Sequence, residues 1–397
     1  MRYYLIAGEA SGDLHGSNLI KGLRAEDPDA RFRFRGGDLM LAAAVGDAPA
    51  DATADSPLVR HYKDGAVMGI GDVIAKAGSL LGDIAACKED ILSWSPDVVI
   101  LIDYPGFNMK IARFCHERGI RVFYYIAPKT WASRSGRNRK LKAWVDRLFI
   151  VFPFEIPYFT KEGIPFIYKG NPLVDAVADS PAMQRPRADF LSANGLPEGR
   201  YIAILAGSRG GEIRRMMPVC MDAVRLLGAD EAFRDFRFVI AGAPSRDASD
   251  YVIDDDLKDK VSVVFGDTYG VLRHAEAAVI NSGTASLEAA LVGTPQVVCW
   301  STGAFAAFIG RNVLRIFDHV KYISLGNLCL DRLVFRELIQ EDFTAPAVAD
   351  EVRRLVADIP YREKMLSGYA EIKESLGGRG ASRAVAASMI QTLKEIS

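Results

Sequence analysis

Eight short apolar runs constrain the fold more than any other feature of the chain. Each run ends in Gly, Pro, Asp or Asn residues and is followed by a longer stretch with helical periodicity. Buried parallel strands that alternate with helices produce this pattern. The sequence therefore predicts an α/β protein with parallel sheets. The runs cover residues 3–7, 98–102, 122–126, 148–152, 201–205, 236–240, 277–280 and 296–299.

The length of 397 residues favours two such domains. The pattern breaks between Asn171 and Gly199, where Pro and small polar residues gather, and a fresh strand-turn-helix series begins at Tyr201. We expect one domain over residues 1–175 and a second over residues 185–375. From about residue 382 to 397, apolar residues recur at helical spacing, which predicts a last helix that covers another surface.

Composition excludes several classes of protein. A net charge of −1 gives no global field for nucleic acid. The five cysteines are scattered and the five histidines are isolated, so the sequence predicts no metal site and favours a reducing cytoplasm. The start is unlike a cleavable signal, and no stretch reaches the roughly 18 apolar residues that span a bilayer. We expect a soluble protein, or one that lies on the inner face of a membrane.

In a doubly wound sheet, ligands bind beyond the carboxyl ends of the strands, so the loops after the apolar runs are the candidate site. The first loop, residues 7–13, places Glu9 and Asp13 after a strand. Two carboxylates would repel a diphosphate, which favours contact with sugar hydroxyls. A plain strand-to-helix turn, with Asp13 near a helix N-terminus, is the alternative.

A second loop brings Asp103 to the end of a buried strand. Partial desolvation there would raise the pKa of the carboxyl and let it accept a proton from an attacking hydroxyl. Asp103 is therefore the candidate base. An aspartate that only caps the turn at Pro105 and Gly106 explains the pattern equally well.

The third and fourth loops together predict a nucleotide site. Gly207, Ser208 and Arg209 precede a helix, where free backbone N–H groups and a guanidinium suit a diphosphate. Residues 282–284 cap a later helix, and Glu288 lies one turn further, where a carboxylate can accept both hydroxyls of a ribose. The alternatives are an Arg209 paired with a nearby carboxylate and a Glu288 on an ordinary surface helix.

Two further segments bear on partners. Basic residues cluster between 134 and 147, which is typical of a solvated helix face but also suits anionic headgroups or a phosphorylated acceptor. Residues 67–81 are mostly apolar, which suits a core helix or a surface that meets an acyl chain.

Eight segments in order resemble the lipid-A-disaccharide synthase family between residue 3 and about residue 340. They are AGEASGDLHG, VMGIGDV, PDVVILIDYPGFN, YYIAPKTWASR, GNPLVD, LAGSRGGEI, NSGTASLEAALVGTPQVV and YISLGNL. The resemblance implies a GT-B fold, with two Rossmann-like doubly wound domains facing a central cleft. The first domain would take the acceptor and the second the UDP-sugar, and the last helix would pack back on the first.

The family activity implied is inverting transfer of 2,3-diacylglucosamine from UDP to the 6-hydroxyl of 2,3-diacylglucosamine 1-phosphate, without a metal or other cofactor. By this resemblance Asp103 is the base, and the donor is bound by Gly207, Ser208, Arg209, Ser282, Gly283, Thr284, Glu288 and Asn327. On the acceptor or sugar side we expect Gly8, Glu9, Ser11, Asp13, Met68, Asn108, Trp131 and Arg134.

The chain departs from the family pattern at Asp72, Ser133 and Asn171, which leaves the acyl-chain length and the acceptor fit open. Two other functions share parts of the pattern. One is a related GT-B enzyme, either a UDP-N-acetylglucosamine epimerase or a peptidoglycan glycosyltransferase. The other is a non-catalytic sugar-nucleotide sensor. The segments VMGIGDV and IDYPGFN argue against the first, and the presence of Asp103, Arg209 and Glu288 argues against the second.

Overall fold

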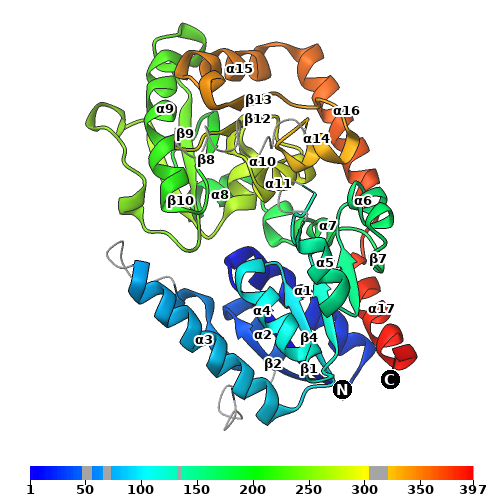
Figure 1. Cartoon of the computed structure of the whole chain (residues 1–397). Coiled ribbons are helices and arrows are strands. Elements are labelled where there is room, and N and C mark those ends of the chain that lie inside the picture. Colours follow the sequence, from blue (N-terminus) through cyan, green and yellow to red (C-terminus); the bar gives the residue numbers. More distant parts are fainter. Residues whose placement is uncertain (47–55, 66–72, 132–135, 304–320, 397) are drawn as a thin grey trace. The chain divides into compact units, whose positions relative to one another are not determined.

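The computed structural model describes residues 1–46, 56–65, 73–131, 136–303 and 321–396 (Figure 1). The chain divides into two compact units. Unit 1 comprises Met1–Ala176 with Gly377–Ser397, and unit 2 comprises Val177–Leu376. Within the described residues each unit contains one sheet whose paired strands are all parallel. The prediction of a two-domain α/β fold with parallel sheets is confirmed.

The sheet of unit 1 has seven strands among the described residues, in the order β3-β2-β1-β4-β5-β6-β7. Its strands are β1 (Arg2–Ala7), β2 (Arg31–Gly36), β3 (Leu58–His61), β4 (Val98–Ile102), β5 (Val122–Tyr125), β6 (Arg147–Ile150) and β7 (Phe166–Tyr168). The helices of this unit are α1 (Ala10–Glu26), α2 (Asp38–Val45), α3 (Val73–Trp94), α4 (Pro105–His116), α5 (Arg137–Trp144), α6 (Glu155–Glu162) and α17 (Ala381–Ile396), and α7 (Pro172–Ala178) spans the boundary between the units.

The sheet of unit 2 has six strands in its described part, in the order β10-β9-β8-β11-β12-β13. They are β8 (Tyr201–Leu205), β9 (Arg237–Gly242), β10 (Val261–Phe265), β11 (Ala277–Asn281), β12 (Gln296–Trp300) and β13 (Glu337–Ile339). The helices are α8 (Arg187–Ala193), α9 (Gly210–Gly228), α10 (Thr268–His274), α11 (Thr284–Val292), α14 (Leu325–Leu330), α15 (Ala345–Ala357) and α16 (Ile359–Ser375).

All eight apolar runs form strands, and in unit 2 they are the four central ones. The sheet edges are formed by β3, β7, β10 and β13. None of these four strands is among the apolar runs that the sequence analysis identified. Strand β2 reads Arg-Phe-Arg-Phe-Arg, and its first residue is exposed. A strand that is not buried on both faces lacks the continuous apolar run by which the others are found.

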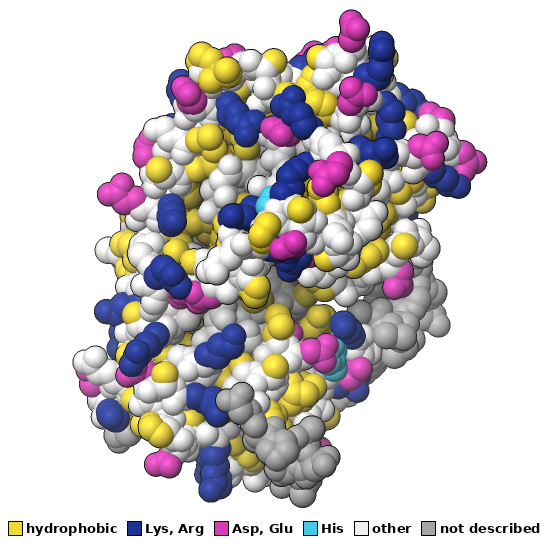
Figure 2. Space-filling view, turned by 180° about the vertical axis from the view of Figure 1, so that it is seen from behind, with side chains coloured by type: hydrophobic (Ala, Val, Ile, Leu, Met, Phe, Trp, Pro, Cys, Tyr) yellow, Lys and Arg dark blue, Asp and Glu magenta, His cyan; other side chains and the backbone are white. Residues whose placement is uncertain are grey.

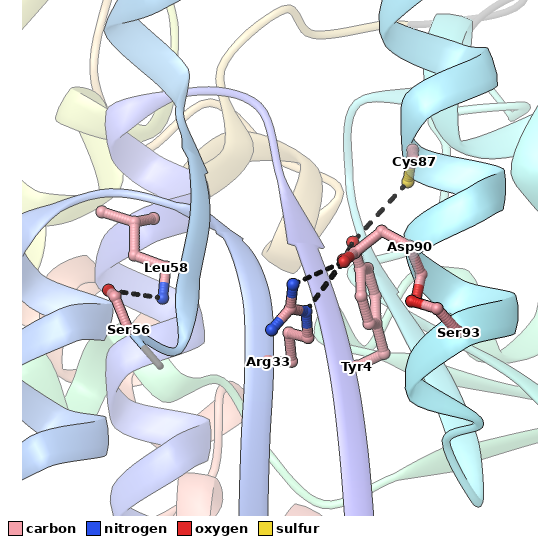
Figure 3. Close-up of polar contacts among 7 residues, drawn as sticks. All are labelled: Tyr4, Arg33, Ser56, Leu58, Cys87, Asp90 and Ser93. Carbon is pink, nitrogen blue, oxygen red and sulfur yellow. Dashed lines mark hydrogen bonds and ion pairs between the residues drawn. The ribbon is translucent and has the colours of Figure 1, made fainter. Parts of the chain in front are cut away.

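Two carboxylates of α3, Asp83 and Asp90, pair with arginines of the sheet in unit 1, and Asp90 makes the shorter contacts (Figure 3). Asp90 accepts hydrogen bonds from Arg33 Nε at 2.9 Å and from Arg33 Nη2 at 2.6 Å. It also accepts one from the Tyr4 hydroxyl at 2.7 Å. The Asp90 side chain is only 13% exposed, so this two-pronged ion pair is better shielded from water than a surface pair. Asp90 thereby fixes the helix that follows residues 66–72.

The last helix returns to unit 1, where α17 packs against α1 (Figure 1). The two backbones approach closely at Gly22. A Cβ atom on Gly22 would lie 2.9 Å from the Ser382 carbonyl oxygen and 3.1 Å from Ala386 Cβ. At the start of α17, the buried Asp175 carboxylate accepts hydrogen bonds from the N–H groups of Gly380 at 2.6 Å and Ser382 at 3.0 Å. The predicted terminal amphipathic stripe therefore has α1 as its partner.

The close approach at Gly22 reverses the usual effect of an alanine substitution. In an open helical position, Gly→Ala stabilises by about 1 kcal/mol. At Gly22 the new methyl group meets backbone, which cannot rotate away, and overpacking costs about 1–3 kcal/mol. We expect Gly22→Ala to lower the free energy of unfolding of unit 1 by up to about 2 kcal/mol.

Gly82 in α3 provides the matched control, because a Cβ atom there would have nothing within 4 Å. Gly82→Ala should stabilise unit 1. Urea denaturation followed by tryptophan fluorescence in a Trp300→Phe background measures both variants, since Trp94, Trp131 and Trp144 lie in unit 1. A gain in stability for Gly22→Ala would contradict the proposed α1 and α17 contact.

Candidate active site

The carboxyl ends of β1 and β4 meet at one edge of unit 1. The two strands pair in register, with Ala7 beside Ile102. Just beyond them the Tyr104 ring lies over Gly8, so closely that a Cβ atom on Gly8 would overlap it. The structure therefore brings the first and second predicted loops together, and the glycine at position 8 is required by this contact.

Asp103 has a left-handed backbone conformation, with a φ angle of 43°. Its N–H donates to the Tyr125 carbonyl at 3.2 Å. Its carbonyl oxygen accepts bonds from the Tyr124 hydroxyl at 2.6 Å and from Asn108 Nδ2 at 2.9 Å. Tyr104, the next residue, is also left-handed, and it precedes the first turn of α4. The main chain of the candidate base is thus held on both sides at the sheet edge.

Two of the predicted sugar-side residues make buried structural bonds. The Asp13 carboxylate accepts bonds from the N–H groups of Gly37 at 2.9 Å and Met40 at 3.0 Å, and so it caps α2. Asn108 is fully buried, and its amide donates to carbonyl groups of β4 and β1 as well as to that of Asp103. Glu9 and Ser11, by contrast, are exposed.

Trp131 belongs to an aromatic group beyond β5 and β6. Its ring meets Phe154 edge-on at 4.9 Å, and Phe154 stacks on Phe152 at 5.2 Å. The next residue after Phe154 is Glu155, which is only 2% exposed. Burial raises the pKa of Glu155 to about 7, although hydrogen bonds from the N–H groups of Phe152 and Val151 favour its ionised form. Sequence reasoning missed Glu155, which follows the 148–152 run by three residues.

In unit 2 the third and fourth predicted loops come together where β8 and β11 pair. Gly207 has a φ angle of 103°, and a Cβ atom on it would lie 2.7 Å from Asn281 Nδ2. Ser208 and Arg209 follow, and both are exposed at the start of α9. Arg209 pairs with Glu212 at 3.3 Å, which is the predicted alternative, but its side chain is 64% exposed. An exposed pair of this kind contributes at most about 1 kcal/mol.

Three further arginines surround the first turn of α9, and sequence reasoning missed them. A Cβ atom on Gly210 would lie 3.2 Å from Arg214 Nη1 and 3.4 Å from Arg246 Nη1, and one on Gly211 would lie 3.4 Å from Arg215 Nη1. Arg246 is held by a bond from its Nε to the Ser208 carbonyl at 3.0 Å. The positive end of α9 and this cluster together suit a diphosphate. Arg246 follows β9, so the rule of strand ends would have found it.

Helix α11 begins at Thr284 after Gly283 and ends before Gly293, which is left-handed. Ser282 Oγ donates to the Ile323 carbonyl at 3.3 Å. Glu288 lies one turn into the helix and accepts a hydrogen bond from the Tyr269 hydroxyl at 3.0 Å. Burial raises the pKa of Glu288, and this bond lowers it.

Asn327 is fully buried, and its amide is engaged within unit 2. Its Nδ2 donates to the Phe335 carbonyl at 3.0 Å and to Glu337 Oε1 at 2.8 Å. Its Oδ1 accepts from the N–H of Val334 at 2.8 Å. Glu337 also accepts bonds from the N–H groups of Ile323 and Ser324, both at 3.0 Å. The Ile323 carbonyl accepts the hydrogen bond from Ser282. Through Ile323, therefore, the pair of Asn327 and Glu337 supports the fourth loop.

Met68, Asp72, Ser133 and Arg134 lie outside the described residues. In the part of the chain that is described, no group of three or more His, Cys, Asp or Glu side chains is placed to hold a metal. Within the same part, no helix is both long and apolar enough to cross a membrane.

Comparison with known proteins gives a consistent result. The sequence matches the family described as Lipid-A-disaccharide synthetase over residues 3–389. The lipid-A-disaccharide synthase of Geobacter metallireducens is 37% identical over 396 residues, which are 99% of this chain and 97% of that protein. The synthase of Acidobacterium capsulatum is 36% identical over 392 residues, 96% of this chain and 92% of that protein.

Solved structures show the same fold at low identity. The UDP-GlcNAc 2-epimerase from Neisseria meningitidis bound to UDP-GlcNAc has a TM-score of 0.68 and 13% identity, over 98% of this chain and 100% of that chain. Sucrose-phosphate synthase from Thermosynechococcus elongatus has a TM-score of 0.55 and 14% identity, over 100% of both chains. These likenesses confirm the predicted GT-B fold. With the family match and the curated relatives, they show that the chain belongs to the lipid-A-disaccharide synthase family of GT-B glycosyltransferases.

Proposed function

We propose that the protein transfers 2,3-diacylglucosamine from its UDP ester to the 6-hydroxyl of 2,3-diacylglucosamine 1-phosphate, forming a β-1,6-linked disaccharide and releasing UDP. Membership of the family supports this reaction. The observation that carries it is Asp103, whose main chain is fixed at the carboxyl edge of unit 1 in a left-handed conformation. Residues held in sparsely populated conformations gather at active sites.

The donor half of the proposal rests on unit 2. The diphosphate would meet the first turn of α9, where Gly207, Ser208 and Arg209 present N–H groups and positive charge, together with the cap at residues 282–284. Glu288 would accept the ribose hydroxyls, and Asn327 would support the fourth loop. The solved epimerase with this fold is bound to UDP-GlcNAc, which supports a UDP-sugar as the donor class.

The reaction would invert the anomeric carbon in one step. The 6-hydroxyl oxygen of the acceptor attacks C1 of the donor sugar while Asp103 takes the hydroxyl proton. The bond between C1 and the phosphate oxygen breaks, and its electron pair leaves on UDP. The N–H groups of α9 and the arginines around it would stabilise that charge. On the acceptor side, Glu9, Ser11 and Trp131 are the proposed contacts of unit 1, and Gly8, Asp13 and Asn108 shape the loops that hold them.

The first test is UDP release from UDP-2,3-diacylglucosamine, with and without 2,3-diacylglucosamine 1-phosphate, in the presence of a chelator. We expect release that depends on the acceptor and is unaffected by the chelator. UDP binding without release would instead indicate a non-catalytic sugar-nucleotide sensor. Failure to bind UDP would contradict the nucleotide site itself.

A substitution at Asp103 tests the base. Asn tolerates the left-handed conformation as Asp does, so Asp103→Asn removes the proton acceptor without changing the backbone requirement. We expect the transfer rate to fall by about 10²–10⁴ while the dissociation constant for UDP stays unchanged. Steady-state kinetics and titration calorimetry measure the two quantities.

Asp97 offers a matched control at the opposite end of β4, where its carboxylate accepts a bond from the Arg2 N–H at 2.7 Å. Asp97→Asn should leave the transfer rate within a few-fold of the native value. If Asp103→Asn transfers sugar as fast as Asp97→Asn, Asp103 is not the base.

We also propose that the protein binds the cytoplasmic face of an anionic membrane, because both proposed substrates carry acyl chains. The support within unit 1 is α5, where Arg139, Lys140 and Lys142 are exposed. Elsewhere, on the face seen in Figure 2, Lys and Arg side chains are interspersed with acidic and apolar ones. Each basic side chain near an anionic surface contributes about 1 kcal/mol.

Flotation with phosphatidylglycerol vesicles at low salt tests this contact. The double variant Arg139→Glu with Lys142→Glu should float several-fold less than the native protein. A double variant in unit 2, Lys258→Glu with Lys373→Glu, changes the net charge equally and should float as the native protein does. An equal loss in both variants would show that net charge governs binding, and not α5.

A further inference from the structure

Glu288 has a partner in a different helix of unit 2. Tyr269 lies in the first turn of α10 and donates its hydroxyl hydrogen to Glu288 Oε1 at 3.0 Å. Helices α10 and α11 pack directly against each other, and both follow strands of the same sheet. The pair therefore joins two helices at the edge where the nucleotide is proposed to bind.

The chemistry of the pair fixes the direction of the bond. Burial and the adjacent carboxylate both raise the pKa of Tyr269, so the phenol keeps its proton and always donates. Burial raises the pKa of Glu288, and the phenol hydrogen bond opposes that effect by favouring the carboxylate. An ionised carboxylate has about four acceptor positions, so one bond from a phenol leaves room for two hydroxyls.

The helix that carries Tyr269 is itself anchored. Asp267 caps α10 by accepting a bond from the Gly270 N–H at 3.2 Å, and it also pairs with Arg185. Asn194 donates to the same carboxylate at 3.3 Å. These contacts hold the first turn of α10 in place, so the Tyr269 hydroxyl is a fixed point against which the Glu288 side chain is oriented.

We propose that Tyr269 is a positioning residue for ribose recognition: its hydroxyl holds the Glu288 carboxylate in the orientation that accepts the 2′- and 3′-hydroxyls of a uridine nucleotide. The inference rests on the proposed role of Glu288 as the ribose ligand. It adds a group that acts through Glu288 and that distinguishes ribonucleotides from deoxyribonucleotides.

The test compares UDP with 2′-deoxy-UDP by titration calorimetry. In Tyr269→Phe the ring remains and only the hydroxyl is lost. We expect UDP to bind about tenfold more weakly, as for a lost hydrogen bond to a charged group, while 2′-deoxy-UDP weakens much less. The preference for UDP over 2′-deoxy-UDP should therefore fall. An equal weakening of both nucleotides would overturn the proposal, because a general structural defect affects both alike.

Unit 2 contains a second pair of the same kind, which serves as the control. Tyr361, in α16, donates to Glu351 Oε1 at 2.6 Å, and Glu351 is 1% exposed. Glu351 lies in α15 and also pairs with Arg336, which precedes β13, whereas the loops of the candidate site follow β8 and β11. Tyr361→Phe removes an equivalent hydroxyl and should leave both dissociation constants unchanged. If it changes the preference as Tyr269→Phe does, the proposal fails.

A double variant separates this inference from the proposed function. If Tyr269 acts through Glu288, then Tyr269→Phe in a Glu288→Gln background should change UDP affinity less than twofold. A Glu288→Gln variant that binds UDP like the native protein would overturn the ribose assignment and this inference with it. Weak UDP binding by Glu288→Gln with native binding by Tyr269→Phe would keep the ribose assignment and overturn only the role of Tyr269.

Discussion

The constraint on which both units depend is that parallel strands all point the same way. Strands β4 and β11 are buried along their whole length, so they have no room for an unpaired charge, whose burial would cost several kcal/mol. The first place for a polar side chain is the residue that ends the strand or follows it, as Asn281 and Asp103 show. Because every strand reaches the same edge, these residues gather there without needing to be close in sequence.

Placing polar residues at the ends of the strands costs backbone strain, and much of this strain lies just after strands. Among the described residues, the left-handed positions other than glycine include Asp103 and Tyr104 after β4, Ile126 after β5 and Gln340 after β13, while Ser95 and Asp331 do not follow a strand. Each such residue costs on the order of 1–2 kcal/mol, and a β-branched side chain such as Ile126 tolerates the conformation least. The Tyr125 carbonyl, the Tyr124 hydroxyl and the Asn108 amide hold Asp103 in this state. We infer that the strain is retained because it directs the first side chain beyond the strand.

The sequence allowed the parallel sheets, the central strands and the terminal helix to be predicted, since buried runs and helical spacing are local patterns. It did not reveal the edge strands. Because β10 was not predicted, Tyr269, which lies in the helix after β10, was not recognised as a candidate site residue. The partner of a polar side chain depends on the tertiary structure: Asp13 caps a helix that begins 25 residues later, and Arg246 contacts the Ser208 carbonyl from the loop after β9. Neither contact follows from spacing, although Arg246 could have been found by reading every strand end alike.

The hydrogen bonds of the carboxylates separate supporting residues from those left to bind a ligand. Asp13, Asp175, Glu155 and Glu337 each accept at least two backbone N–H groups, so much of their acceptor capacity is used in fixing turns and helix starts. For Glu288, the hydrogen bond found among the described residues comes from one phenol. A carboxylate that is held in place but far from saturated is suited to accept hydroxyls from a sugar. By this criterion Asp13, which sequence alone placed beside the sugar, groups with the supporting residues, and Glu288 remains the proposed ribose ligand.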